Sequence, residues 1–194
     1  MKPTIIAITG PSCAGKDTLM RQLIREFNTG EMIERFPDVY YIVSSTTRPP
    51  RMNEDDRNYH FISNDEFIDR IIHRDMLEWT QFNGWKYGTD KHSVSNKPNA
   101  INIGIFNLQG VDTLNNRNDF NIIPIYLDVD WRERLQRSIR REHRMSLEII
   151  RRMFSDYKDF AHSYKVLNKN HNLLRYTKNY DIDTVMQDIL GQIK

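Results

Sequence analysis

The chain has 194 residues, of which 39% are hydrophobic and 28% charged. That length suits one well-buried core with small appended lobes, and the composition lies well away from that of disordered chains. A formal net charge of +2 is too near balance to indicate nucleic acid or a membrane surface as the partner. The single cysteine, Cys13, excludes an internal disulfide framework, so a reducing, cytoplasmic setting is the simplest expectation.

The N-terminal segment predicts a buried strand, a turn and a helix, in that order. Residues Thr4–Thr9 (TIIAIT) are β-branched and apolar on both faces, which is typical of a central parallel strand. This run is too short for a signal-peptide core or a membrane span. Apolar residues then recur at helical spacing between Asp17 and Phe27, which predicts an amphipathic helix.

The middle of the chain predicts a small inserted lobe between Val43 and Val94. A strand at Val39–Val43 leads into the segment SSTTRPPR, residues 44–51, which we expect to be exposed and rigid because its paired prolines fit neither a helix nor a central strand. Ser63, with Glu66 three residues on, predicts a capped helix. The apolar stripe expected on that helix consists of Phe67, Ile68, Ile71 and Ile72.

The second half predicts two more core strands and a basic helix. The strands are expected at Ile101–Phe106 and Ile122–Val129, and their alternation with helices favours an α/β fold. The basic focus of the chain lies in residues 131–152, whose arginines are Arg132, Arg134, Arg137, Arg140, Arg141, Arg144, Arg151 and Arg152. Nucleic-acid binding through this segment is disfavoured by the balanced total charge.

A phosphate-binding loop is expected between the first strand and the first helix. The residues GPSCAGKD fit the pattern G-x-x-x-x-G-K, and the strand–turn–helix context aims backbone N–H groups and a helix N-terminus at phosphate. Asp17 stands where a Ser or Thr normally offers a hydroxyl to magnesium, and Thr18 follows one residue late. The expected donor-binding residues are Gly10, Pro11, Ser12, Cys13, Ala14, Gly15, Lys16, Asp17 and Thr18. The chain is therefore predicted to be a P-loop phosphotransferase.

Two downstream segments suggest the acceptor. Arg48 and Arg51 lie three residues apart on the proline-containing segment, where forked guanidinium groups could clamp a phosphate. The segment LEWTQFNGWKYGT places Glu78 and Tyr87 around a turn. Either feature alone would be unremarkable.

Together and in this order, GPSCAGKDTL, SSTTRPPR, NYHFISNDEF, LEWTQFNGWKYGT and NLQGV resemble guanylate kinase over essentially the whole chain. The resemblance implies an α/β fold with a P-loop NTPase-type parallel-sheet core. It also implies one domain, 1–194, made of a core (1–43, 95–130 and 153–194), an inserted nucleoside-monophosphate-binding lobe (44–94) and a helical lid (131–152). The implied reaction moves a phosphoryl group from ATP, with Mg2+, to GMP or dGMP. Such a kinase needs nucleotides as partners, needs no nucleic acid or membrane, and would be a monomer or homodimer.

The resemblance also assigns roles to individual residues. Acceptor-phosphate contacts fall on Arg48, Arg51, Tyr59 and Tyr87, and guanine contacts on Ser44, Glu78 and Thr89. Adenine would be rejected, because Glu78 can accept from guanine N1–H and N2–H whereas adenine has a bare lone pair at N1. The catalytic cations would be Lys16 and the lid arginines Arg137, Arg141 and Arg152, with Arg134 as a rival. Asn168 is nominated beside the adenine.

The chain departs from the family at two positions. Guanylate kinases usually carry carboxylates where this chain has Ile105 and Asn107; one carboxylate helps organise magnesium and the other helps read guanine. We hypothesise that Asp17 replaces the missing charge at the metal, with Thr18 beside it as a second ligand. Asn107 stays in the acceptor pocket with an altered, mixed hydrogen-bonding character.

Two other functions remain open at this stage. One is a related kinase acting on a phosphorylated sugar such as ribose 1,5-bisphosphate, since such enzymes resemble this chain in the G-K-D residues of the loop and in an Asn near the position of Asn107. The other is a guanylate-kinase-like module that binds peptides without catalysis. The retained Lys16 and the arginine-rich lid argue against the module, and the retained Glu78 argues against the sugar kinase.

Overall fold

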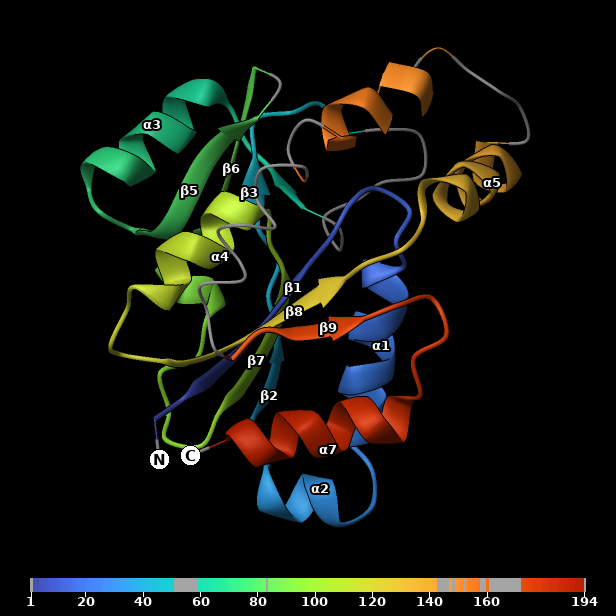
Figure 1. Ribbon diagram of the computed structural model, residues 1–194. Coiled ribbons are helices and arrows are strands. Elements are labelled where there is room, and N and C mark those ends of the chain that lie inside the picture. Colours follow the sequence, from blue (N-terminus) through green and yellow to red (C-terminus); the bar gives the residue numbers. More distant parts are fainter. Residues whose placement is uncertain are drawn as a thin grey trace.

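The computed structural model describes residues 2–50, 59–82, 84–142, 147, 149–151, 153–157, 160 and 172–193. A five-stranded sheet at the centre has the order β2-β7-β1-β8-β9 with every neighbouring pair parallel. Its strands are β1 (Thr4–Thr9), β2 (Val39–Tyr41), β7 (Ile101–Ile105), β8 (Asn121–Leu127) and β9 (Leu174–Tyr176). This sheet confirms the predicted α/β fold, and the strand order brings the end of β1 between the ends of β7 and β8 (Figure 1).

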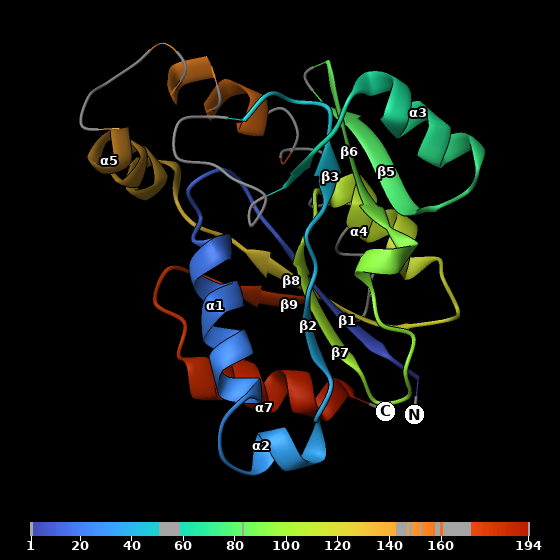
Figure 2. The ribbon, with the colours of Figure 1, turned by 180° about the vertical axis from the view of Figure 1, so that it is seen from behind.

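The central strand β1 is buried along its whole length and feeds two hydrophobic cores. Ile6 and Ile8 belong to one core and Ile5 and Ala7 to the other, because successive side chains point to opposite faces of a sheet. The helices α1 (Lys16–Phe27), α2 (Gly30–Arg35) and α7 (Ile182–Gln192) lie on the first face, and α4 (Leu108–Asn115) lies on the second (Figures 1 and 2). Both views place the two chain ends close together, away from the loop that follows β1.

A second, four-stranded sheet stands above the carboxyl ends of the first, with the order β4-β3-β6-β5. Its strands are β3 (Ser45–Thr46), β4 (His60–Phe61), β5 (Met76–Phe82) and β6 (Trp85–Asp90), with the helix α3 (Asn64–Ile72) beside them and a short turn η1 (Lys91–Ser93) after them. The predicted cap of α3 is confirmed, because Ser63 Oγ accepts from the Glu66 N–H at 3.1 Å. On the opposite side of the molecule, α5 (Trp131–Glu142) carries the arginines (Figure 1).

One expectation about the inserted region is wrong in part. The segment 44–51 was expected to be exposed, and Pro49 and Pro50 are, yet Ser45 and Thr46 are fully buried because they form a strand of the second sheet, and Arg48 is 8% exposed. On α3, the stripe residue Phe67 packs inside while Ile72 is 69% exposed. One small sheet gives α3 a single side to cover. Among the described residues, no helix is long and apolar enough to cross a membrane.

Candidate functional site

The phosphate loop follows β1 as the sequence predicts. Gly10 has φ +149°, and a Cβ there would lie 2.8 Å from the Leu127 carbonyl oxygen, so the loop can leave the sheet only through a glycine. Gly15, at φ +103°, precedes the first residue of α1. Between them Cys13 adopts φ 60°, a left-handed conformation that is unusual for a residue with a side chain. The loop thus folds back over the N-terminus of α1.

Lys16 turns its ammonium group onto the loop itself. Nζ donates to the carbonyl oxygens of Gly10 at 2.7 Å and Pro11 at 2.9 Å. Burial lowers the pKa of Lys16, and the nearby carboxylate of Asp156 acts against that shift. The lysine is therefore placed to exchange neutral carbonyl acceptors for phosphate oxygens.

One cavity of about 420 Å³ joins this loop to the second sheet. Three elements supply its walls: the loop after β1, the facing strands β5 and β6, and the N-terminal end of α4. The residues that the sequence nominated and that line it are Gly10, Ser12, Lys16, Ser44, Tyr59, Glu78, Tyr87 and Asn107. The structure thus brings part of the expected donor set and part of the expected acceptor set to one space, whereas Arg48 and Thr89 do not line it. Arg51, Arg152 and Asn168 were also nominated, and they lie outside the described residues.

Glu78 lies at the acceptor end of this cavity and is 6% exposed. The pairing of β5 with β6 shifts register between Met76 and Glu78, an irregularity of the kind that re-aims a side chain. Burial raises the pKa of Glu78 to about 7, although hydrogen bonds from the hydroxyl and backbone of Thr89 partly oppose this. Ser44 Oγ lies 3.1 Å from Thr89 Oγ1. These three side chains form a polar cluster, in which the hydroxyl and backbone of Thr89 are the donors that oppose the effect of burial on Glu78.

The end of α4 closes over the carboxylate of Glu78. Asn107 caps this helix, because its Oδ1 accepts from the Gly110 N–H at 2.7 Å. A Cβ on Gly110 would lie 2.7 Å from Glu78 Oε2, so the close approach depends on glycine. The carbonyl oxygen of Asn107 is thereby engaged within the protein. Its NH2 group donates hydrogen bonds where a carboxylate could only accept them. Asn107 lines the cavity as expected but acts structurally through its cap.

Arg48 and three aromatic rings form a second cluster, of which Tyr59 and Tyr87 line the same cavity as Glu78. The rings of Tyr59 and Tyr87 meet edge to face with centroids 6.0 Å apart. The guanidinium of Arg48 lies over Tyr59 and over Phe61, at 5.6 and 5.7 Å from their ring centroids. The arrangement holds a buried arginine and two phenol groups close together, which suits the binding of a phosphate.

The lid arginines divide into two that reach the loop and one that does not. Arg134, 7% exposed, donates to the carbonyl oxygen of Val129 at 3.1 Å and to that of Ser12 at 3.4 Å. Arg137 donates to the carbonyl oxygen of Ala14 at 3.1 Å. Arg141 is exposed on α5. The rival Arg134, rather than Arg141, accompanies Arg137 at the loop, because Arg141 lies one turn further along α5 than Arg137.

A carboxylate that the sequence did not nominate completes the loop's surroundings. Asp156 belongs to the helical residues 153–157, is 7% exposed, and lines the same cavity as Lys16 and Glu78. It accepts from the backbone N–H of Ser12 at 2.9 Å and pairs with Arg134 at 2.9 Å. Nothing in the local sequence distinguishes this aspartate from its acidic neighbours, since its partners lie far away in the chain.

The two magnesium ligands predicted from the sequence lie in the first turn of α1. Asp17 and Thr18 are both exposed there. Burial is the main cause of the raised pKa of Tyr41, and the negative charge of Asp17 adds to it. The carboxylate of Asp17 is therefore near Tyr41, at the end of β2. β2 is the neighbour of β7, whose last residue is Ile105. Asp17 therefore lies on the side of the loop that faces β2.

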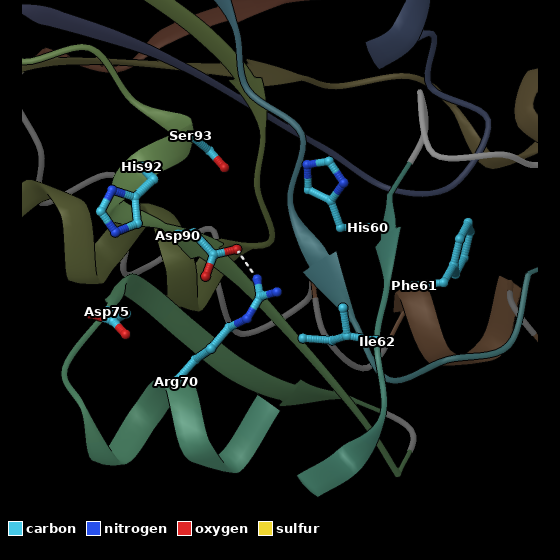
Figure 3. Close-up of a pocket in the computed structure, with 8 residues that line it drawn as sticks. All are labelled: His60, Phe61, Ile62, Arg70, Asp75, Asp90, His92 and Ser93. Atoms are coloured by element: carbon cyan, nitrogen blue, oxygen red, sulfur yellow. Dashed lines mark hydrogen bonds and ion pairs between the residues drawn. The ribbon is translucent and has the colours of Figure 1, made fainter. Parts of the chain in front are cut away.

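A second cavity, of about 510 Å³, opens on the α3 side of the second sheet (Figure 3). Arg70 reaches from α3 into this cavity and donates to Asp90 at 2.7 Å and to Ser45 at 3.1 Å, while Ser45 donates to Asp90 at 2.6 Å. These groups satisfy one another. Since Ser44 and Thr89 are the chain neighbours of Ser45 and Asp90, the network also holds in place the strands that carry the Glu78 cluster.

The loop, the joined cavity and the arginine-bearing helix define a P-loop phosphotransferase of the nucleotide-kinase type. The chain belongs to the guanylate kinase family, whose model ("Guanylate kinase") matches residues 1–186.

Proteins named guanylate kinase match over most of the chain. One from Prochlorococcus marinus is 31% identical over 98% of this chain and 96% of its own, and one from Clostridium perfringens is 32% identical over 86% and 76%. The solved guanylate kinase from Anaplasma phagocytophilum covers 100% of this chain and 88% of its own with a TM-score of 0.62. At 17% identity this structural likeness shows the fold alone.

Proposed function

We propose that the protein is an ATP-dependent kinase that phosphorylates GMP or dGMP to the diphosphate. The observation that carries this proposal is the placement of Glu78 and Lys16 on the walls of one cavity. A carboxylate suited to a base with adjacent N–H donors then lies opposite a loop suited to a triphosphate. The relatives' names point the same way.

Guanine recognition is assigned to the Glu78 cluster. In its ionised form Glu78 can accept from the N1–H and N2–H groups of guanine, and Ser44 and Thr89 offer hydroxyls beside it. Adenine cannot donate from N1, so its binding would leave a buried carboxylate unpaired. This chemistry favours a purine base over the sugar bisphosphate alternative, which has no such donor pair.

Phosphoryl transfer is assigned to positioning and charge screening. Arg48, Tyr59 and Tyr87 hold the acceptor phosphate, and Arg51 is proposed to join them. Lys16 moves from the loop carbonyls to the β- and γ-phosphates of the donor, and a lid arginine screens the transferring group. The acceptor oxygen attacks the γ-phosphorus of ATP as the bond to the β-phosphate oxygen breaks, which leaves ADP and a nucleoside diphosphate. Arg137 is the described arginine best placed for that role, with Arg141 and Arg152 as further proposed lid groups.

Magnesium is proposed to accompany ATP and to be held mainly by phosphates and water. Among the described residues, no group of three or more His, Cys, Asp and Glu side chains could hold a metal ion. The exposed oxygens of Asp17 and Thr18 fit the usual magnesium mode, in which one or two protein ligands assist the substrate phosphates. The metal would neutralise phosphate charge, and Asp17 would orient it directly or through water.

A steady-state assay of ADP release with a panel of acceptors tests this function. GMP and dGMP should support turnover, whereas AMP, UMP, dTMP and ribose 1,5-bisphosphate should give kcat/KM values lower by roughly a hundredfold or more, because each lacks the guanine donor pair. A Lys16→Ala variant provides the background rate. Turnover on ribose 1,5-bisphosphate but not on GMP would favour the sugar kinase, and turnover on no acceptor would favour the binding module.

A further inference from the structure

We propose that the carboxylate of Asp156 occupies hydrogen-bond donors of the phosphate loop in the free protein, and that the phosphoryl donor must displace it from them. In the structure the carboxylate of Asp156 takes up donors that face the reaction cavity. Its negative charge would hold the affinity of the free protein for ATP below the value that the loop would otherwise provide. The inference rests on the proposed use of ATP as the donor.

Both oxygens of Asp156 are engaged. Oδ2 accepts from the Ser12 N–H at 2.9 Å and from Arg134 Nη1 at 2.9 Å, and Oδ1 accepts from Ser12 Oγ at 3.1 Å. The side chains of Arg134 and Asp156 are each 9% exposed, so water screens this pair only weakly. A backbone N–H, a hydroxyl and a guanidinium are also the donors that phosphate oxygens take. The carboxylate therefore uses groups suited to the incoming ligand.

The other cationic groups at the loop are occupied differently. Lys16 donates to the neutral carbonyl oxygens of Gly10 and Pro11. Arg137 Nη1 donates to the neutral carbonyl oxygen of Ala14, while its Nε pairs at 3.1 Å with Glu133 of the same helix, which does not line the cavity. A phosphate can replace a neutral acceptor without meeting a like charge. Replacing Asp156 is different, because a full negative charge stands in the cavity that the polyanionic triphosphate enters.

Displacement of Asp156 would also couple donor binding to the segment after α5. Ser12 and Asp156 are 144 residues apart in the chain, and Asp156 is carried by a helical piece that stands above the phosphate loop (orange in Figure 1). The same aspartate holds Arg134 of α5. The bonds from Arg134 to the Val129 and Ser12 carbonyl oxygens keep this arginine beside the loop. Its charge would become available to the donor as the carboxylate leaves, so that one movement removes a repulsive group and supplies an attractive one.

The test compares ATP binding to the wild type, Asp156→Asn and a charge-matched control, Asp128→Asn. Asp128 pairs with Arg175 at the surface and does not line the cavity. Isothermal titration is performed with ATP in the presence of EDTA and again with excess Mg2+. Asp156→Asn should lower the Kd for ATP by roughly fivefold to tenfold without metal, as expected for removing one charge near a phosphate at an intermediate dielectric. Asp128→Asn should leave it within about twofold.

Other outcomes overturn the inference. An unchanged or weaker affinity of Asp156→Asn in EDTA would mean that the carboxylate braces the loop in the bound state as well. A loss of affinity confined to the Mg2+ titration would make Asp156 a metal-organising group instead. Failure of the wild type to bind ATP under either condition would contradict the proposed function itself, whereas turnover with unchanged Asp156→Asn affinity would contradict only this inference.

A measurement on the wild type tests the same inference if the Asp156→Asn variant does not fold. The carboxyl carbon of Asp156, assigned by nuclear magnetic resonance, should shift when a non-hydrolysable ATP analogue is added in EDTA, because its Ser12 and Arg134 donors are removed. The carboxyl carbon of Asp128 serves as the internal control. An Asp156 resonance that stays in place at saturating analogue would contradict displacement.

Discussion

At the scale of single residues, Glu78 has the most informative environment. Its carboxyl is buried against Thr89 and the start of α4, and burial raises its pKa to about 7. A site for guanine needs the ionised form, which the free protein holds only at some cost. Two adjacent N–H donors from a base would remove that cost. The free site is therefore tuned so that ligand binding and loss of a proton accompany each other.

The first prediction concerns the pH dependence of GMP binding. Because the protonated carboxyl cannot accept both guanine N–H groups, the Kd for GMP should rise about tenfold per pH unit as the pH falls below about 7. Calorimetric titrations between pH 5.5 and 8.5 measure this slope. Glu78→Gln should bind more weakly and lose most of the slope, and what remains reports the phosphate of GMP. An equal slope in both proteins would contradict this role for Glu78.

The same shift has a consequence for stability. Since the folded pKa of Glu78 lies above its usual value of 4.5, the native state binds more protons than the unfolded state between those two pH values. The free energy of unfolding should consequently fall as pH rises from about 4.5 to about 7. Denaturant titrations of ligand-free wild type and Glu78→Gln should differ in this window, with the variant lacking that decline.

Cys13 gives a second prediction at this scale. Its φ of 60° costs a residue with a side chain about 1–2 kcal/mol, and glycine would relieve this strain. Part of that gain is cancelled, because glycine makes the unfolded chain more flexible and so favours unfolding. Cys13→Gly should therefore stabilise the protein by about 0.5–1 kcal/mol in urea unfolding. Cys13→Ser keeps the strained backbone and should show no such gain. A destabilised glycine variant would show that packing of the thiol outweighs the strain.

Asp17 gives the third. If its carboxylate replaces the family charge missing at Ile105, Asp17→Asn should raise the Mg2+ concentration needed for half-maximal turnover and lower kcat. Thr18→Val tests the neighbouring hydroxyl separately. A magnesium titration of Asp17→Asn that superimposes on that of the wild type would leave Asp17 as a residue that merely favours the helix dipole.

At the scale of elements, the second sheet depends on a polar network as well as on backbone pairing. β3 has only two residues, Ser45 and Thr46, and so makes few backbone hydrogen bonds with its neighbours. The side chains of Arg70, Asp90 and Ser45 tie α3 to β3 and β6. Figure 3 shows the contact between Arg70 and Asp90. Small shifts in the pairing of β3 with β6 or of β5 with β6 would move Ser44 and Thr89 relative to Glu78.

The fourth prediction tests that network. Arg70→Leu leaves the buried Asp90 with one fewer donor and should cost about 1–3 kcal/mol of folding stability. Its kinetic signature should be a raised KM for GMP with kcat and the KM for ATP nearly unchanged, because the phosphate loop belongs to the other sheet. Arg70→Lys should restore part of the GMP affinity. Equal changes in both KM values would contradict a local positioning role.

Elements of regular pattern were predictable from the sequence, and elements held by distant contacts were not. The apolar run of β1 and the spacing of α1 indicated the strand, loop and helix that the structure contains. In contrast, β3 was expected to be an exposed segment, because its burial comes from pairing with β4 and β6 rather than from its own residues. Asp156 was missed for the same reason, and Arg134 was named only as a rival, since its partner Asp156 lies 22 residues away in another element.

At the scale of the whole molecule, each of the two sheets presents a different part of the candidate site. The parallel sheet presents the phosphate loop at its carboxyl edge, as open α/β sheets generally do, while the antiparallel part of the second sheet presents Glu78. A single cavity connects them, and α5 with residues 153–157 borders the loop from the remaining side (Figures 1 and 2). Binding of two nucleotides across this cavity would draw the parts together and exclude water from the transferred group.

Phosphorus NMR of a competitive mixture tests the central claim most directly. The protein is added to ATP and Mg2+ with GMP, AMP and ribose 1,5-bisphosphate present at equal concentrations. The account predicts that ADP and GDP signals grow in equal amounts while AMP and the sugar bisphosphate persist unchanged. Growth of a product from the sugar or from AMP in place of GDP, or conversion of ATP to ADP and inorganic phosphate without GDP, would contradict it.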